Sequence, residues 1–256
     1  MTAMKVLGNI IPILMSFFLI SAGVLSVKED AKDVVKKADM KMRGKTSTAE
    51  MTIQIVRPTW SREMTLKAWS KETTLAMILI TSPVREQGTV FLKRDKEVWN
   101  WVPSIERIIK LPPSMMTQSW MGTDFTNDDL VKESSVVDDY IHSFAGDSVI
   151  DGRDCYKIQL IPKPEAAVVW GKILLWIDKK DYLQMGARFY DEENTLVSTM
   201  HCSEIKIMGG RLIPTKVEMV PADKKGQKTV MLYRSISFDQ PIEDYFFTTQ
   251  NMKKVK

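Results

Sequence analysis

The chain has 256 residues, of which 36 are basic and 32 acidic, so its formal net charge is +4. Acidic and basic residues are interspersed along the sequence, which excludes the clustered basic surface that nucleic-acid binding requires. The chain has 2 cysteines, and a chain of this size does not need a disulfide framework.

The N-terminus has the pattern of a secretory signal peptide. Lys5 is the single charged side chain before Lys28, and the apolar run between them ends in small residues. A positive start, an apolar centre and a small-residue end are typical of a cleaved export signal, here residues 1–26, with the cut after Gly23 or Ser26. The run is also about long enough to span a bilayer, so a retained membrane anchor is the alternative.

Two hydrophobic periods follow one another in the next part of the chain. In residues 28–45 the apolar residues recur at three- and four-residue spacing, which predicts an amphipathic helix that ends at Gly44. Beyond it the period becomes two, as in a strand with one buried face. The strand predicted over residues 74–81 is apolar on both faces, so we expect cover on both sides. The predicted strands of this half are residues 47–56, 61–70, 74–81, 88–95, 96–103 and 106–111.

The second half continues the strand pattern after a break. Pro112 and Pro113 interrupt the pattern, and residues 126–133 then predict a short helix capped by Thr126. No helical pattern separates the later strands, so we expect antiparallel neighbours in a meander within one domain, residues 27–256. The predicted strands are residues 154–162, 171–178, 183–191, 195–208, 211–221 and 228–238, and residues 241–252 predict a short helix or turn over one barrel end.

Catalytic and metal-binding patterns are absent from the sequence. Neither His142 nor His201 has a metal-ligand neighbour at helical or strand spacing. Cys202 follows His201 directly, and adjacent strand residues point to opposite faces, so the two side chains cannot easily meet. The chain lacks nucleophile-elbow, zinc-protease, phosphate-loop and dinucleotide motifs. We therefore expect no enzyme, no metal and no cofactor; the catalytic alternative is a hydrolase whose carboxylates come from distant strands.

Residues 98–125 gather three tryptophans, three methionines and three prolines. Because proline breaks both helices and ladders, this segment cannot be one continuous core element. Methionine is flexible and re-packs around variable partners, which suits an adaptable apolar binding surface. The alternative interpretation is that these large residues belong to an ordinary hydrophobic core.

The order of these features resembles the LolA-like family of outer-membrane lipoprotein-sorting proteins. The features are Trp99 and Trp101 before Pro103, Arg107 among apolar neighbours, the turn at residues 121–125 before Asp128, Asp129 and Leu130, and the runs 211–219 and 241–248. The resemblance implies a mainly β fold, an incomplete antiparallel barrel (a half-barrel) of about ten or eleven strands with a helical lid over an apolar cavity. It also implies a periplasmic carrier that shelters the acyl chains of lipids or lipoproteins.

A carrier of this kind has to bury hydrocarbon reversibly. An acyl chain gains roughly 0.8 kcal/mol per buried methylene, and a curved sheet supplies an apolar wall whose backbone groups are already paired. The double proline lets the following residues leave the sheet and lie across its opening. The candidate cavity and lid residues are Met51, Ile53, Ile55, Met64, Leu66, Trp99, Trp101, Ile108, Met115, Met116, Trp120, Met121, Phe125 and Leu175.

Other features of a carrier are left more open by the sequence. Arg107 is the candidate polar gate, and Arg62 is the other arginine that could fill this role. Cys155 and Cys202 could form a disulfide after export, and the sequence does not decide whether they do. The expected cargo is a lipoprotein or lipid acyl chain held by a monomer, with an inner-membrane transporter and an outer-membrane acceptor as candidate partners. The alternative is a non-carrier envelope binding module or an accessory protein of an inner-membrane lipid exporter of the resistance-nodulation-division type.

Overall fold

The computed structural model describes residues 1–2, 29–132 and 136–256. The predicted signal peptide therefore lies outside the described residues, apart from its first two. Within the described ranges, none of the helices is both long and apolar enough to cross a membrane. The helices and strands are α1 (Ala31–Arg43), β1 (Thr46–Val56), β2 (Ser61–Lys71), β3 (Leu75–Ser82), β4 (Val90–Arg94), β5 (Glu97–Val102), β6 (Arg107–Lys110), β7 (Tyr140–Ile150), β8 (Arg153–Pro162), β9 (Lys172–Asp178), β10 (Gln184–Tyr190), β11 (Leu196–Met208), β12 (Arg211–Pro221), β13 (Lys228–Phe238) and α2 (Thr249–Met252).

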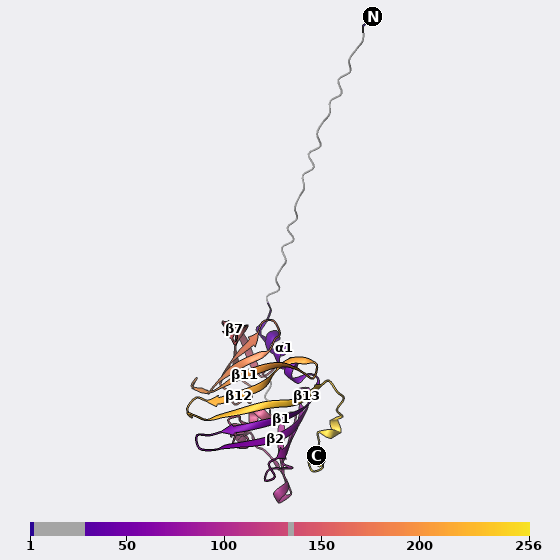
Figure 1. Ribbon diagram of the computed structural model, residues 1–256, viewed down its shortest axis with the longest axis vertical. Coiled ribbons are helices and arrows are strands. Elements are labelled where there is room, and N and C mark those ends of the chain that lie inside the picture. Colours follow the sequence, from indigo (N-terminus) through magenta and orange to yellow (C-terminus); the bar gives the residue numbers. More distant parts are fainter. Residues whose placement is uncertain (3–28, 133–135) are drawn as a thin grey trace.

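The strands form one antiparallel sheet of 13 strands in the described part of the chain, in the order β6-β5-β4-β3-β2-β1-β13-β12-β11-β10-β9-β8-β7. The order is two meanders joined where β1 pairs with β13, and these two strands lie side by side in Figure 1. β6 and β7 are the two edges, so the sheet curls without closing into a barrel. The predicted antiparallel half-barrel is confirmed, with more strands than the ten or eleven that the resemblance implies.

The sheet order also explains the proline-rich break. Because β6 and β7 lie at opposite edges, the chain that joins them has to cross the sheet. We call residues 111–132 the crossing segment. It contains a 3-10 turn, η2 (Pro113–Met115), and one turn of π-helix, η3 (Asp128–Lys132), which corresponds to the short helix predicted after Thr126. Its side chains pack on the inner face of the sheet, with Trp120 fully buried there.

Alternating side chains divide the core between the two faces of the sheet. Ile78 and Ile80 of β3 belong to the large inner core, whereas Met77 and Leu79 of the same strand belong to a separate outer cluster. The prediction that this strand is covered on both sides is therefore confirmed. The outer cluster also contains Phe247, because the C-terminal residues fold back over the outer face of β3 and β4.

The amphipathic helix α1 begins and ends as its sequence predicts. Its apolar stripe, represented by the fully buried Val34, packs against strands of the second meander, including β7, β9 and β12. Gly44 follows with a φ of +67°, and its N–H donates to the carbonyl of Met40. A side chain at Gly44 would also place its Cβ 2.9 Å from Oδ1 of Asp239. Glycine therefore satisfies both the backbone turn and the close approach of the last strand.

Two segments differ from the sequence-based prediction. β7 was not predicted, because most of its side chains are exposed and it therefore lacks alternating apolar residues. The C-terminal residues do form short turns, η4 (Asp244–Phe246) and α2, as predicted. However, they cover the outer face of the first meander rather than a barrel end, because the outward side chains of β3 to β5 are apolar and form a cluster with Phe246 and Phe247.

Candidate functional site

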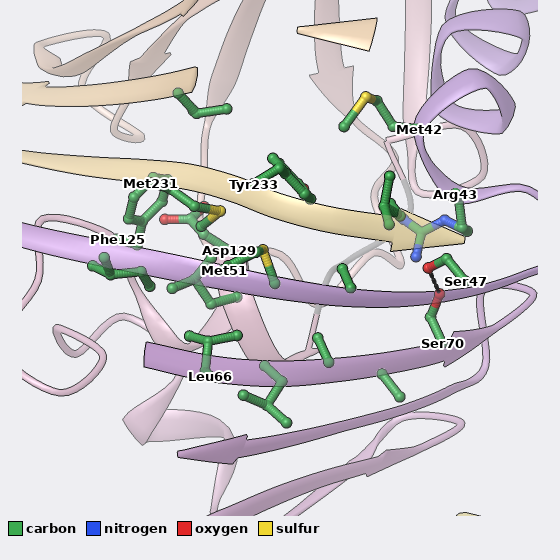
Figure 2. Close-up of a pocket in the computed structure, with 18 of the residues that line it drawn as sticks. Met42, Arg43, Ser47, Met51, Leu66, Ser70, Phe125, Asp129, Met231 and Tyr233 are labelled. Carbon is green, nitrogen blue, oxygen red and sulfur yellow. Dashed lines mark hydrogen bonds between the residues drawn. The ribbon is translucent and has the colours of Figure 1, made fainter. Parts of the chain in front are cut away.

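A cavity of about 280 Å³, partly open to solvent, lies between the inner face of the sheet, α1 and the crossing segment. Its walls come from β1, β2 and β3 on one side and from β10 to β13 on the other. Figure 2 shows the cavity with Met51 and Leu66 between its two ends. The cavity is therefore enclosed by elements from both meanders, and two of its boundaries are segments outside the sheet.

The middle of the cavity is apolar and partly lined by flexible side chains. Met51 and Leu66 are cross-strand partners on β1 and β2, and Met231 of β13 pairs with Ile53, two residues along β1 from Met51. Met42 and Met200 also line the cavity. Methionine side chains have three rotatable bonds and adapt to irregular volume, so this wall can adjust its shape around a guest.

One end of the cavity is polar and lies against α1. Arg43 and Asp39, one turn apart on α1, form an ion pair with 3.1 Å between Nη2 and Oδ1. The hydroxyl groups of Ser47 and Ser70, from β1 and β2, are 2.8 Å apart (Figure 2). At this end the polar groups of the wall thus pair with one another.

Asp129 lies in the wall at the opposite end of the cavity, on the crossing segment (Figure 2). Its Oδ1 accepts from Nε1 of Trp170 at 2.9 Å, and its Oδ2 accepts from the backbone N–H of Thr126 at 2.8 Å. The Thr126 hydroxyl accepts from the Asp129 backbone in return, which is a reciprocal helix cap. Burial away from water raises the pKa of Asp129 despite these bonds.

Two arginines hold the tip of the crossing segment, which we define as residues 120–125, against the sheet. Arg57, just after β1, forms a buried ion pair with Asp124 at 2.9 Å and donates to the carbonyl of Gly122. The same carboxylate accepts from the hydroxyl of Thr229 on β13 at 2.7 Å. Arg62 of β2 donates to the carbonyl of Met121. These contacts join the tip to three adjacent strands.

A second cavity, of about 800 Å³, lies near the two free edges of the sheet. It is lined by residues around β5 and β6 on one side and by residues 163–169 on the other, with Leu111 and Met116 from the crossing segment. Many of its lining residues are charged, including Lys96, Lys110 and Glu165. More of its lining residues are therefore charged than in the first cavity.

The structure brings together most of the predicted cavity residues. Five line the first cavity: Met51, Ile53, Leu66, Trp120 and Phe125. Ile55, Met64, Met116 and Leu175 are buried in the same inner core, and Met115 and Met121 pack against it. Trp99, Trp101 and Ile108 instead lie in the outer cluster with the C-terminal residues, because they occupy the outward positions of their strands.

The structure also shows where the candidate gate residues and the two cysteines lie. Arg107 is exposed at the start of the edge strand β6, whereas Arg62 contacts the crossing segment. Cys155 and Cys202 are both buried free thiols. Cys155 lies in a third cluster, with Trp176, and Cys202 lines the first cavity. Burial raises the pKa of Cys202 to about 12, so this thiol stays protonated at neutral pH.

Several residues of the site were not predicted from the sequence. Arg57 and Asp124 were missed because they are 67 positions apart and neither lies in an alternating pattern. Asp129 was part of an acidic pair that a solvated helix start explains equally well, and its burial depends on Trp170 from a distant loop. Among the described residues, no group of three or more His, Cys, Asp or Glu side chains could hold a metal ion.

The half-barrel and its internal cavity define the LolA class of fold, and solved structures confirm it. The chain aligns with a DUF1329 family protein from Desulfovibrio piger at 22% identity and a TM-score of 0.79, over 87% of this chain and 97% of the other. A LolA superfamily protein from Nitrosomonas europaea aligns at 22% identity and 0.75, over 87% and 99%. A domain described as an outer-membrane lipoprotein-sorting protein, from Vibrio parahaemolyticus, aligns at 19% identity and 0.76, over 88% and 100%.

A family model described as "-like: Uncharacterized protein" matches residues 72–254, and the chain belongs to this family. No curated protein matches the chain. The expected resemblance to LolA-like proteins is therefore confirmed at the level of the fold.

Proposed function

We propose that this protein is a periplasmic carrier that holds an acyl chain of a lipid or lipoprotein in the first cavity. The observation that carries the proposal is the partly open, mainly apolar cavity between the sheet, α1 and the crossing segment. The domain from Vibrio parahaemolyticus that is described as an outer-membrane lipoprotein-sorting protein supports this interpretation, since its fold matches 88% of this chain. Export by the signal peptide of residues 1–26 would bring the carrier to this compartment.

The size of the cavity bears on how cargo would be held. At roughly 30 Å³ for each water-sized group, 280 Å³ accommodates about nine methylenes. Burying nine methylenes at roughly 0.8 kcal/mol each contributes about 7 kcal/mol before the cost of association. Such a moderate gain suits a carrier that has to release its cargo. A longer chain, or several chains, requires the wall to move outward.

The crossing segment is the wall best suited to move. The sheet is held by continuous strand pairing, whereas the tip of the crossing segment is attached mainly through Arg57, Arg62 and Thr229. Breaking these contacts would free the tip without unpairing a strand. We propose that cargo enters and leaves by displacement of this segment, with an inner-membrane transporter as donor and an outer-membrane protein as acceptor.

Filling the cavity provides a direct test of the carrier function. Ala49 and Ala68 line the cavity on β1 and β2, so the double substitution Ala49→Leu and Ala68→Leu replaces empty volume with side chain. A fluorescent fatty acid should bind the wild-type protein and bind the filled variant at least about tenfold more weakly. Ala222→Leu, at an exposed position on the turn after β12, is the matched control and should bind like wild type.

The far-ultraviolet circular dichroism of the filled variant should remain that of the wild type, which separates loss of the cavity from loss of the fold. If the wild-type protein binds no fatty acid, or if the filled variant binds it equally well, the first cavity is not a cargo site and the carrier proposal is wrong.

A further inference from the structure

The polar groups of the first cavity are satisfied at one end and incomplete at the other. Near α1, Asp39 pairs with Arg43, and the two serine hydroxyls pair with each other. Near the crossing segment, the side chain of Trp120 also lines the cavity and is completely buried. Its indole N–H has no hydrogen-bond acceptor in the described part of the chain.

The position of Trp120 is fixed by its surroundings. Its backbone N–H donates to the carbonyl of Phe125 at 2.9 Å, and its own carbonyl accepts from the backbone and hydroxyl of Thr123. Its ring packs against Phe91, with 5.5 Å between the ring centroids. The indole therefore cannot easily turn away to find a partner. Leaving a buried donor unpaired is unfavourable, so an acceptor supplied by a guest would be stabilised by the same group.

Asp129 lies at the same end of the cavity and adds a second potential donor. Its two oxygens already accept from Trp170 and Thr126, at 2.9 and 2.8 Å. Burial raises the pKa of this carboxyl, which favours the neutral form. A neutral carboxyl carries one O–H that can donate. This end of the cavity therefore has the unpaired indole N–H of Trp120, and the neutral form of Asp129 would add an O–H.

We propose that Trp120 and Asp129 form a carbonyl-binding subsite that accepts the oxygen of an acyl ester in the cargo. The cargo is then an esterified acyl chain, with its ester against the crossing segment and its hydrocarbon along Met51 and Leu66. An unsubstituted hydrocarbon would leave the indole N–H unpaired. This inference rests on the proposed carrier function and adds the chemical class of the cargo.

The subsite is tested by comparing two guests of matched chain length, methyl palmitate and a plain alkane. Each is used to displace a bound fluorescent fatty acid, and the ratio of their affinities is measured. Trp120→Phe should lower the ester-to-alkane ratio about tenfold, because the N–H that meets the carbonyl is removed while the alkane loses no hydrogen bond. Trp69→Phe, at a tryptophan whose ring packs against Phe246 in the outer cluster, should leave the ratio unchanged.

A spectroscopic measurement on the wild-type protein keeps the test independent of any variant. Methyl palmitate labelled with ¹³C at its carbonyl should show a stretching band at lower frequency when bound than in an alkane solvent, as expected for a hydrogen-bonded ester. A band at the alkane-solvent position, or an ester-to-alkane ratio that Trp120→Phe does not change, overturns the subsite and leaves the carrier function standing. Failure of every guest and of the fluorescent fatty acid to bind overturns both.

Discussion

Asp129 is a residue whose pKa depends on its place in the fold. Its carboxyl is buried in the cavity wall, and burial raises its pKa above the ordinary value of 3.8. In the unfolded chain the same carboxyl ionises near that ordinary value. The unfolded state therefore releases a proton at a lower pH than the folded state does.

This difference predicts how stability changes with pH. Below 3.8 both states are protonated; as the pH rises past this value the unfolded state ionises first, so folding becomes less favourable until the folded carboxyl ionises too. Asp129→Asn removes this contribution. From about pH 4 upward, the unfolding free energy of wild type should fall relative to that of Asp129→Asn by up to about 1.4 kcal/mol per pH unit. Urea unfolding of both proteins at several pH values measures the difference, and parallel curves would contradict the prediction.

The alternation of side chains in the sequence predicted which residues share a face of a strand. It did not always predict which segment of the chain covers that face. Met51, Ile53 and Leu66 were predicted for the cavity, and they line it. Trp99 and Trp101 share the outward face of β5, and alternation alone is consistent with either face. Their actual cover is the C-terminal segment, which is distant in sequence and is positioned only by the complete fold.

At the scale of elements, the buried ion pair between Arg57 and Asp124 governs the crossing segment. Removing Arg57 leaves the Asp124 carboxylate buried without its cation, with the hydroxyl of Thr229 still donating to it. Arg57→Ala should therefore lower the unfolding free energy by about 3 kcal/mol. Lys206→Ala, which breaks an exposed pair with Glu204, should cost less than about 1 kcal/mol and is the control.

Arg57→Ala should increase local opening of the tip more than it increases unfolding of the whole sheet. In Arg57→Ala, the amides of Trp120 and Thr123, which bond within the tip, should exchange with deuterium faster than in wild type. Amides of β3, in the centre of the first meander, should change only through global unfolding. Equal acceleration in both regions would mean that the tip does not open separately from the sheet.

The C-terminal segment is a second element with a separable role. Phe247 is completely buried in the outer cluster, on the face of the sheet opposite the cavity. Phe247→Ala should lower the unfolding free energy by about 3–5 kcal/mol while leaving fatty-acid affinity unchanged. Tyr245→Ala, at a neighbouring aromatic side chain that is 75% exposed, should change neither property. Weaker fatty-acid binding by folded Phe247→Ala would show that the outer face affects the cavity.

How well elements could be predicted depended on their burial. Among the described residues, the strand pattern predicted 12 of the 13 strands, because most of them have an apolar period on a buried face. β7 was missed because it is an edge strand with few buried side chains, so pairing with β8 rather than its own pattern makes it a strand. The hairpin between β4 and β5 turns at Asp95, whose φ of +54° is adopted without the expected glycine or asparagine.

At the scale of the whole molecule, the two meanders, α1 and the crossing segment enclose a space that none of them forms alone. The resemblance to LolA-like proteins implied this enclosure, whereas local patterns gave only the strands. The join between β1 and β13 brings the first and last strands together, so the cavity wall depends on residues from both chain ends. Opening of the cavity therefore has to be a property of the assembled fold.

Cys202 provides a measure of that opening, because its buried thiol lines the cavity and has a pKa of about 12. In a Cys155→Ser background, a thiol reagent should modify Cys202 slowly, since both burial and the protonated state oppose reaction. Arg57→Ala, which frees the tip of the crossing segment, should accelerate modification about tenfold, and a bound fatty acid should slow it again by occupying the cavity. Modification at the same rate with and without Arg57 would show that the crossing segment does not control access to the cavity.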